Sequence, residues 1–236
     1  MVGTGSTIVG ERSGQDDCDV AIPSSVIHEL RTPLTAIHGY AQVLHRALAS
    51  DPSKSRATNV LLAESTRLAA LLNQLSELAS LRAGSVDRTI ENIDVAGVAR
   101  LVVGDRERRS PKHTLTVQGQ ASMRADRHSI EQLLGHVVDN AIAYSPDGGK
   151  ITVQISRDAE GVHIAVTDPG IGIVPEDTER IYQCYQRGLN AKRAGVRGLG
   201  LGLHIACSIA EREGGRIWHE PATPLGTTFH VLLPGR

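Results

Sequence analysis

The residues best suited to group transfer lie in the segment Ile27-His28-Glu29-Leu30-Arg31-Thr32-Pro33. A neutral imidazole is a usable nucleophile near neutral pH, because its pKa lies in that range. Glu29 places a carboxylate beside His28 that can take up the ring proton. Pro33 removes a backbone donor and bends a helix. The segment predicts a helix that presents a nucleophilic histidine; the alternative is a solvated histidine without a chemical role.

A second polar group lies on a helix that we expect to begin at Asp126. His136, Asn140 and Tyr144 follow one another at intervals of four residues, so they project from one face of that helix. An imidazole, an amide and a phenol in line can meet a metal ion, phosphates and a flat ring. The alternative is a polar rim on an amphipathic helix.

Two glycine-rich segments follow. Asp168-Pro169-Gly170-Ile171-Gly172 comes directly after a predicted strand, where a carboxylate can accept hydrogen bonds from a purine amine; a plain turn is the alternative. The later run contains Gly198, Gly200 and Gly202. Glycines let backbone amides approach phosphate oxygens, and the amino terminus of the following helix favours an anion. Neither segment is a Walker loop or a dinucleotide-binding fingerprint.

The nucleophilic segment belongs to a predicted helical hairpin that follows a flexible lead-in of residues 1–20. Apolar residues recur along the first helix at alternating intervals of four and three, at Leu30, Leu34, Ile37, Ala41, Leu44 and Leu48. A second leucine-rich helix is expected to end near Arg82. Two such helices cannot bury a wide apolar stripe alone, so we expect a second copy to complete a four-helix bundle. The alternative is docking onto the rest of the chain. His38 and His45 are expected at the surface.

The remainder of the chain predicts alternating strands and helices. Strands are expected at 89–95, 113–118, 122–124, 150–156, 162–167, 216–219 and 227–233, and helices at 96–109, from 126 onward, and at 199–213. Strands grouped around a few helices suggest an α+β sandwich, with helices on one face of a mixed sheet.

Composition excludes several classes of partner. The 236 residues carry a net charge of −1 and only 3% aromatic side chains, so neither electrostatics nor base stacking favours nucleic acid. No signal peptide and no run of 18 apolar residues occurs, so we expect no membrane segment in this chain and a cytoplasmic location.

Taken together over about residues 20–233, the order of these motifs resembles the catalytic core of the sensor histidine kinases of two-component systems. The resemblance implies a multi-domain α and α+β fold. Residues 21–84 would form a dimerisation and histidine phosphotransfer domain, a helical hairpin in a dimeric four-helix bundle. Residues 85–236 would form a catalytic ATP-binding domain, an α/β sandwich of the Bergerat (GHKL) type.

The resemblance also implies the chemistry of the hairpin. His28 would be autophosphorylated from ATP in the presence of Mg²⁺ and would pass the phosphoryl group to an aspartate on a response-regulator receiver domain. Glu29 would orient the ring and accept its proton. Thr32 would position water for a phosphatase activity towards that partner. The chain would act as a homodimer.

In the second domain, the resemblance implies that Asn140 ligates magnesium, that Tyr144 lies near the adenine and that Asp168 recognises it. Further residues implied to contact the nucleotide are Gly170, Gly172, Arg187, Gly198, Gly200 and Gly202. Two positions depart from the family pattern: His136 replaces a polar residue, usually asparagine, and can still contact the metal, whereas Ala143 replaces a phosphate-binding lysine.

Those departures keep a second function open, a catalytically weak, nucleotide-binding dimeric scaffold or phosphatase. A Bergerat-type ATPase or a serine kinase of the anti-sigma type would explain the second domain but not the His28 hairpin.

Overall fold

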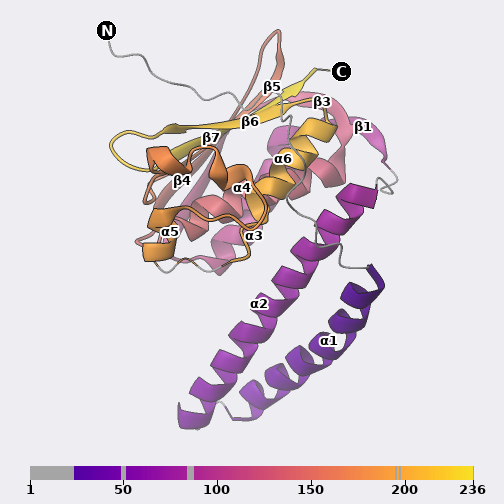
Figure 1. Cartoon of the computed structure of the whole chain (residues 1–236), viewed down its shortest axis with the longest axis vertical. Helices are drawn as coiled ribbons and strands as arrows, with labels where there is room; N and C mark the ends of the chain where they lie inside the picture. The colour runs from indigo at the N-terminus through magenta and orange to yellow at the C-terminus, as the bar shows by residue number, and fades with distance from the viewer. Residues whose placement is uncertain (1–23, 49–51, 84–87, 195, 197, 236) are drawn as a thin grey trace. The chain divides into compact units, whose positions relative to one another are not determined.

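The computed structural model describes residues 24–48, 52–83, 88–194, 196 and 198–235. The contacts divide the chain into two compact units, a helical hairpin within residues 18–86 and an α/β unit that includes residues 87–236 (Figure 1). The predicted lead-in of residues 1–20 lies outside the described residues. None of the described helices is long and apolar enough to cross a membrane.

The hairpin consists of α1 (Ser24–Ala47) and α2 (Pro52–Ala83), which run side by side (Figure 1). The two helices meet at Leu34 and Leu72, which are 5% and 6% exposed, and α2 adds the partly buried Ala69, Leu75 and Ala79 around them. The helical hairpin predicted from apolar spacing is confirmed.

Only some positions of the predicted apolar stripe are covered within one chain. Ala41 is fully buried, whereas Ile37 and Leu44 of α1 are 49% and 46% exposed. On α2, Leu61 and Leu68 are 44% and 49% exposed. Each helix thus has a pair of large apolar residues, seven positions apart, that the hairpin itself leaves about half exposed.

The expectation that His38 and His45 lie at the surface is wrong. Both are half-buried against α2. Nδ1 of His38 is 2.8 Å from the Ser65 hydroxyl, and its Nε2 is 3.0 Å from Nε2 of Gln42. Nδ1 of His45 is 3.3 Å from the Thr58 hydroxyl. These histidines join the two helices because α2 places hydroxyl groups opposite them.

The α/β unit is built on a five-stranded mixed sheet in the order β2-β4-β5-β7-β6. Its strands are β2 (His113–Gly119), β4 (Gly149–Arg157), β5 (Gly161–Asp168), β6 (Arg216–Pro221) and β7 (Thr227–Pro234). Strands β2 and β4 are parallel and the other pairs antiparallel. In addition, β1 (Ile90–Asp94) and β3 (Ser122–Asp126) form a separate antiparallel pair.

Three helices, α3 (Val95–Arg109), α4 (Arg127–Ala143) and α6 (Gly202–Arg212), lie against one face of the sheet (Figure 1). Alternation along β5 shows which face they cover, because Val162, Ile164 and Val166 are fully buried while the residues between them are not. The predicted sandwich, with helices on one face of a mixed sheet, is confirmed.

Helix α6 begins at Gly202, three residues later than predicted. Gly198 and Gly200 have φ values of +156° and +72°, which a right-handed helix does not allow. The stretch before them contains the short helices η1 (Pro175–Asp177), η2 (Arg180–Tyr182) and α5 (Leu189–Arg193). Gly198 and Gly200 therefore form a loop that leads into α6.

Candidate functional site

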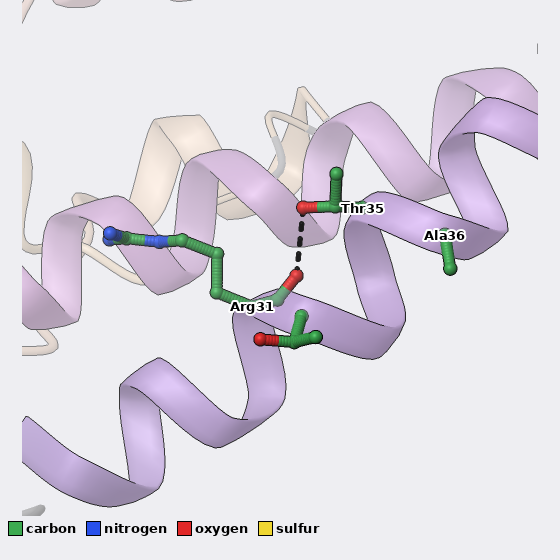
Figure 2. Close-up of a pocket in the computed structure, with 4 residues that line it drawn as sticks. Arg31, Thr35 and Ala36 are labelled. Atoms are coloured by element: carbon green, nitrogen blue, oxygen red, sulfur yellow. Dashed lines mark hydrogen bonds between the residues drawn. The ribbon is translucent and has the colours of Figure 1, made fainter.

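His28 and Glu29 lie in the first two turns of α1; their side chains, and that of Pro33, fall outside the part described. Their predicted pairing therefore stays a prediction. One turn further on, Arg31, Thr32, Thr35 and Ala36 line a surface pocket (Figure 2). The hydroxyl of Thr35 donates to the carbonyl of Arg31 at 2.9 Å, as Figure 2 shows. Thr32 is exposed and lies on α1 one turn after His28.

In the α/β unit, Asp168 ends β5 and is only 3% exposed. Its Oδ1 accepts a hydrogen bond from the Gly170 amide at 2.8 Å. Burial raises the pKa of Asp168 to about 6, although hydrogen bonds from the backbone of Gly170 and Thr227 act in the opposite direction. A further hydrogen bond, such as one from a base amine, would stabilise the ionised form of this buried carboxylate.

Gly170 joins this carboxylate to the end of α4. A Cβ at this position would lie 2.3 Å from the Tyr144 carbonyl oxygen and 2.6 Å from Oδ1 of Asp168. The next amide, of Ile171, donates to the same carbonyl at 3.0 Å. The loop after β5 and the carboxyl end of α4 are therefore in direct backbone contact, and only glycine fits between them.

The residues predicted on α4 belong to the helix that ends at this corner. Asn140 and His136 are half-buried one turn apart, and Tyr144 ends the helix. Burial raises the pKa of the Tyr144 phenol, and the positive charge of Arg187 partly offsets this rise. Tyr144 and Arg187 are thus electrostatic neighbours. Nη1 of Arg187 donates to the Val196 carbonyl at 2.7 Å, so its guanidinium is fixed on the loop before the glycine-rich turn.

The glycine-rich turn contacts the segment before Arg187. Gly200 accepts a hydrogen bond from the Tyr185 amide at 3.1 Å, and a Cβ on Gly200 would lie 2.4 Å from the Gln186 carbonyl oxygen. Helix α6 then starts without a side-chain cap, whereas Asp94 and Asp126 cap α3 and α4. Uncapped amides at a helix amino terminus are suited to a phosphate.

Three features here escaped the sequence prediction. A Cβ on Gly226, which has a φ of +114°, would lie 1.9 Å from the Asp168 carbonyl oxygen. Nδ2 of Asn190 donates to the carbonyls of Ile171, at 3.3 Å, and Gly172. Ser145, next to Tyr144, is buried. Gly226, directly before the predicted strand 227–233, could have indicated the close approach from the sequence alone. The hydrogen bonds of Asn190 and the burial of Ser145 depend on residues distant in sequence.

Replacing Asp168 with asparagine is expected to change stability and nucleotide affinity in opposite directions. The folded pKa exceeds the ordinary 3.8, so ionising Asp168 costs stability as pH rises from about 4 to about 6, and the cost stays above pH 6. Without nucleotide, the Asp168→Asn chain should be more stable at pH 7, by up to about 3 kcal/mol. On the expectation that Asp168 recognises the adenine, an amide group facing the base amine should weaken ADP binding about 100-fold or more. Thermal unfolding and calorimetric titration measure the two effects; a destabilised variant with unchanged ADP affinity would contradict both.

Comparison with known proteins agrees with this geometry. Residues 125–236 match the family described as histidine kinase-, DNA gyrase B-, and HSP90-like ATPase, and residues 24–84 match the His Kinase A (phospho-acceptor) domain. The sensor-like histidine kinase SenX3 of Mycobacterium tuberculosis is 31% identical over 217 residues, which cover 89% of this chain and 52% of SenX3. The sensor histidine kinase WalK of Bacillus subtilis is 30% identical over 220 residues, 89% of this chain and 36% of WalK.

Solved structures show the same fold. Full-length ShkA in complex with AMPPNP superposes with a TM-score of 0.70 at 23% identity, covering 89% of this chain and 45% of ShkA. The mycobacterial sensor histidine kinase MprB gives 0.56 at 27% identity, covering 63% of this chain and 99% of that one.

The sheet, its three covering helices and the Asp168 corner define an ATPase unit of the GHKL type, preceded by a phospho-acceptor hairpin. The chain therefore carries the catalytic core of a protein-histidine kinase. It spans about half the length of SenX3 and about a third of WalK.

Proposed function

We propose that this chain transfers the γ-phosphoryl group of ATP to His28 and from there to an aspartate on a response-regulator receiver domain. The observation that supports this most is the pairing of two units in one chain. One is a phospho-acceptor hairpin with His28 on α1, and the other is an ATPase unit with a buried carboxylate beside a glycine that admits no side chain.

The nucleotide would lie between α4, the loop after β5 and the start of α6. Asp168 would accept from the adenine amine beside Tyr144, with Gly170 and Gly172 allowing close approach. Arg187 and the turn formed by Gly198, Gly200 and Gly202 would face the phosphates. The support is the backbone contact of the loop after β5 with the end of α4, the contact of the Gly200 turn with the segment before Arg187, and the uncapped start of α6.

Magnesium, which neutralises charge on transferring phosphates, would be held by Asn140 with help from His136. The described residues contain no cluster of three or more acidic, histidine or cysteine side chains able to bind a metal ion. Mg²⁺ takes few protein ligands and several from phosphates and water. The two α4 side chains suit that incomplete set, because both are half-buried on one helix face.

In the transfer, a neutral ring nitrogen of His28 attacks the γ-phosphorus. The bond from that phosphorus to the β–γ bridging oxygen breaks, ADP leaves, and Glu29 takes the ring proton. The receiver aspartate then attacks the same phosphorus, so that a P–O bond replaces the P–N bond. Thr32 would place a water for hydrolysis of the resulting acyl phosphate, which gives the phosphatase activity.

We also propose the boundaries 21–84 for the phosphotransfer domain and 85–236 for the ATP-binding domain, and a cytoplasmic place of action, where ATP is available.

The test of the function is incubation with γ-labelled ATP and magnesium. The protein should acquire label that acid removes and alkali does not. ADP binding without such label would instead favour the catalytically weak scaffold or phosphatase. Ala143, which is exposed at the end of α4 where the family commonly has lysine, supports that alternative.

We further propose that the hairpin pairs with a second copy. Ile37 and Leu44 on α1, with Leu61 and Leu68 on α2, are large apolar side chains at seven-residue spacing that their own chain leaves between 44% and 49% exposed. Two such hairpins can bury these residues against each other in a four-helix bundle.

Replacing Ile37 with glutamate is expected to dissociate the dimer. Each dimer would lose two apolar contacts and gain two charges in the seam, which should raise the dimer dissociation constant at least about 100-fold. Val43, also on α1 and 61% exposed, lies outside the predicted stripe, so Val43→Glu is the matched control and should remain dimeric. Sedimentation velocity gives both masses, and equal dissociation by the two variants would refute this seam.

A further inference from the structure

One side chain joins the loop after β5 to the short helix α5. Asn190, half-buried at the start of α5, donates from Nδ2 to the carbonyl oxygens of Ile171, at 3.3 Å, and Gly172. Its Oδ1 accepts from the Ala191 amide at 2.9 Å. Because carbonyls only accept and a backbone amide only donates, these three partners fix which end of the carboxamide is the nitrogen. A single carboxamide therefore spans from α5 to the loop after β5.

Helix α5 depends on such contacts for its position. It has 5 residues, far fewer than the roughly 12–15 that an isolated helix needs to be stable in water. A buried carboxylate also holds its start, because Asp177 is 1% exposed and its Oδ2 accepts from the Leu189 amide. Oδ1 of Asp177 is 3.6 Å from Nη1 of Arg180. Other segments thus fix the place of α5, and Asn190 makes the contact with the loop after β5.

Arg187, which we assign to the phosphates, comes directly before this pair of contacts. The next residue is Gly188, where a Cβ would lie 2.9 Å from Oδ1 of Asn190 and 3.1 Å from Oδ2 of Asp177. The chain therefore passes between the carboxamide and the carboxylate immediately after Arg187, through a space that a side chain would crowd. A change in the contacts of Asn190 acts on the backbone that carries the guanidinium.

We propose that Asn190 is a positioning residue, which holds the backbone of Arg187 in a fixed place relative to the loop that receives the base. The inference rests on the proposed nucleotide site and deepens it, because it names the link between the base-binding part and the phosphate-binding part. Asn190 would not contact the nucleotide. Its contribution to nucleotide affinity therefore passes through Arg187 and needs the guanidinium to be present.

The test is a double-mutant cycle in the whole chain, with affinity for the ATP analogue AMPPNP and magnesium measured by calorimetric titration. Asn190→Ala should raise the dissociation constant about 3- to 10-fold, because Arg187 then faces the phosphates in only a fraction of the molecules. Arg187→Gln should raise it about 10-fold or more, since a charge-assisted hydrogen bond is lost. In the Arg187→Gln background, Asn190→Ala should change it by less than about 2-fold, because the group that Asn190 positions is gone.

The cycle separates positioning from a general structural role. If Asn190→Ala weakens binding by the same factor in both backgrounds, or not at all in the unsubstituted chain, the inference is wrong and the nucleotide site stands. If Arg187→Gln binds AMPPNP as the unsubstituted chain does, the assignment of Arg187 to the phosphates falls, and the inference falls with it. Absence of AMPPNP binding by the unsubstituted chain would overturn the nucleotide site itself.

Ser129 offers a matched control for lost stability. It is 1% exposed near the start of α4, and its hydroxyl donates to Oδ2 of Asp126 at 2.7 Å and accepts from Nη2 of Arg212 at 2.9 Å. Ser129→Ala should lower the unfolding temperature and leave AMPPNP affinity unchanged. A drop in AMPPNP affinity as large as that of Asn190→Ala would mean that destabilisation alone explains the effect, against a positioning role.

Discussion

Replacing His28 with glutamine is expected to abolish acid-labile phosphorylation, to below about 1% of the unsubstituted chain, because glutamine has no nucleophilic nitrogen. Affinity for ADP should not change, since the residues proposed to bind the nucleotide belong to the other unit. Labelling with γ-labelled ATP, followed by treatment with acid and with alkali, measures the first effect, and titration with ADP measures the second.

His38 provides the control on the same helix. Both of its ring nitrogens lie within hydrogen-bonding distance of a neighbour, at Ser65 and Gln42, so its lone pair is not open to a phosphorus atom. The His38→Gln chain should retain label, with some loss of hairpin stability from the broken link to α2. Acid-labile label that persists in His28→Gln and disappears in His38→Gln would show that the acceptor histidine has been misassigned.

Replacing Gly170 with alanine is expected to remove nucleotide binding, with an increase of at least about 100-fold in the dissociation constant of ADP, a loss of at least about 2.7 kcal/mol. The added Cβ would lie 2.3 Å from a backbone oxygen of Tyr144 and 2.6 Å from Oδ1 of Asp168. Since real Cβ atoms do not approach this closely, the loop must move away from α4 and carry the carboxylate with it. Calorimetric titration with ADP measures the loss.

Gly104 in α3 is the control, because a Cβ there meets nothing within 4 Å. The Gly104→Ala chain should bind ADP normally and gain roughly 0.5–1 kcal/mol in stability, since alanine favours a helix interior. Normal ADP affinity in Gly170→Ala would mean that the loop after β5 does not position the base-recognising carboxylate.

Most of the elements could be predicted from local sequence. In α4, buried apolar residues recur at helical spacing after Asp126, whose side chain accepts from the Ser129 amide. In β5, buried residues alternate with less buried ones. Both patterns reflect interactions within a few residues, and they survive tertiary packing because the core lies on one side of each element.

What could not be predicted depends on neighbours distant in sequence. The hydroxyls of Ser65 and Thr58 turn His38 and His45 into contacts between helices. The close approach of Gly226 to Asp168 follows from the pairing of β5 with β7. The pairing of β1 with β3 outside the main sheet has the same origin, because no local pattern specifies which strand a given strand will join.

Burial of Asp168 at the end of β5 has one more consequence. Burial raises the pKa of this carboxyl to about 6, so mildly acidic pH favours its protonated form when no nucleotide is bound. An adenine amine donates best to the ionised form and so pulls the pKa down. On the proposed assignment of Asp168 to the base, we expect nucleotide uptake at mildly acidic pH to release protons, and the affinity for nucleotide to depend on pH through this one buried side chain.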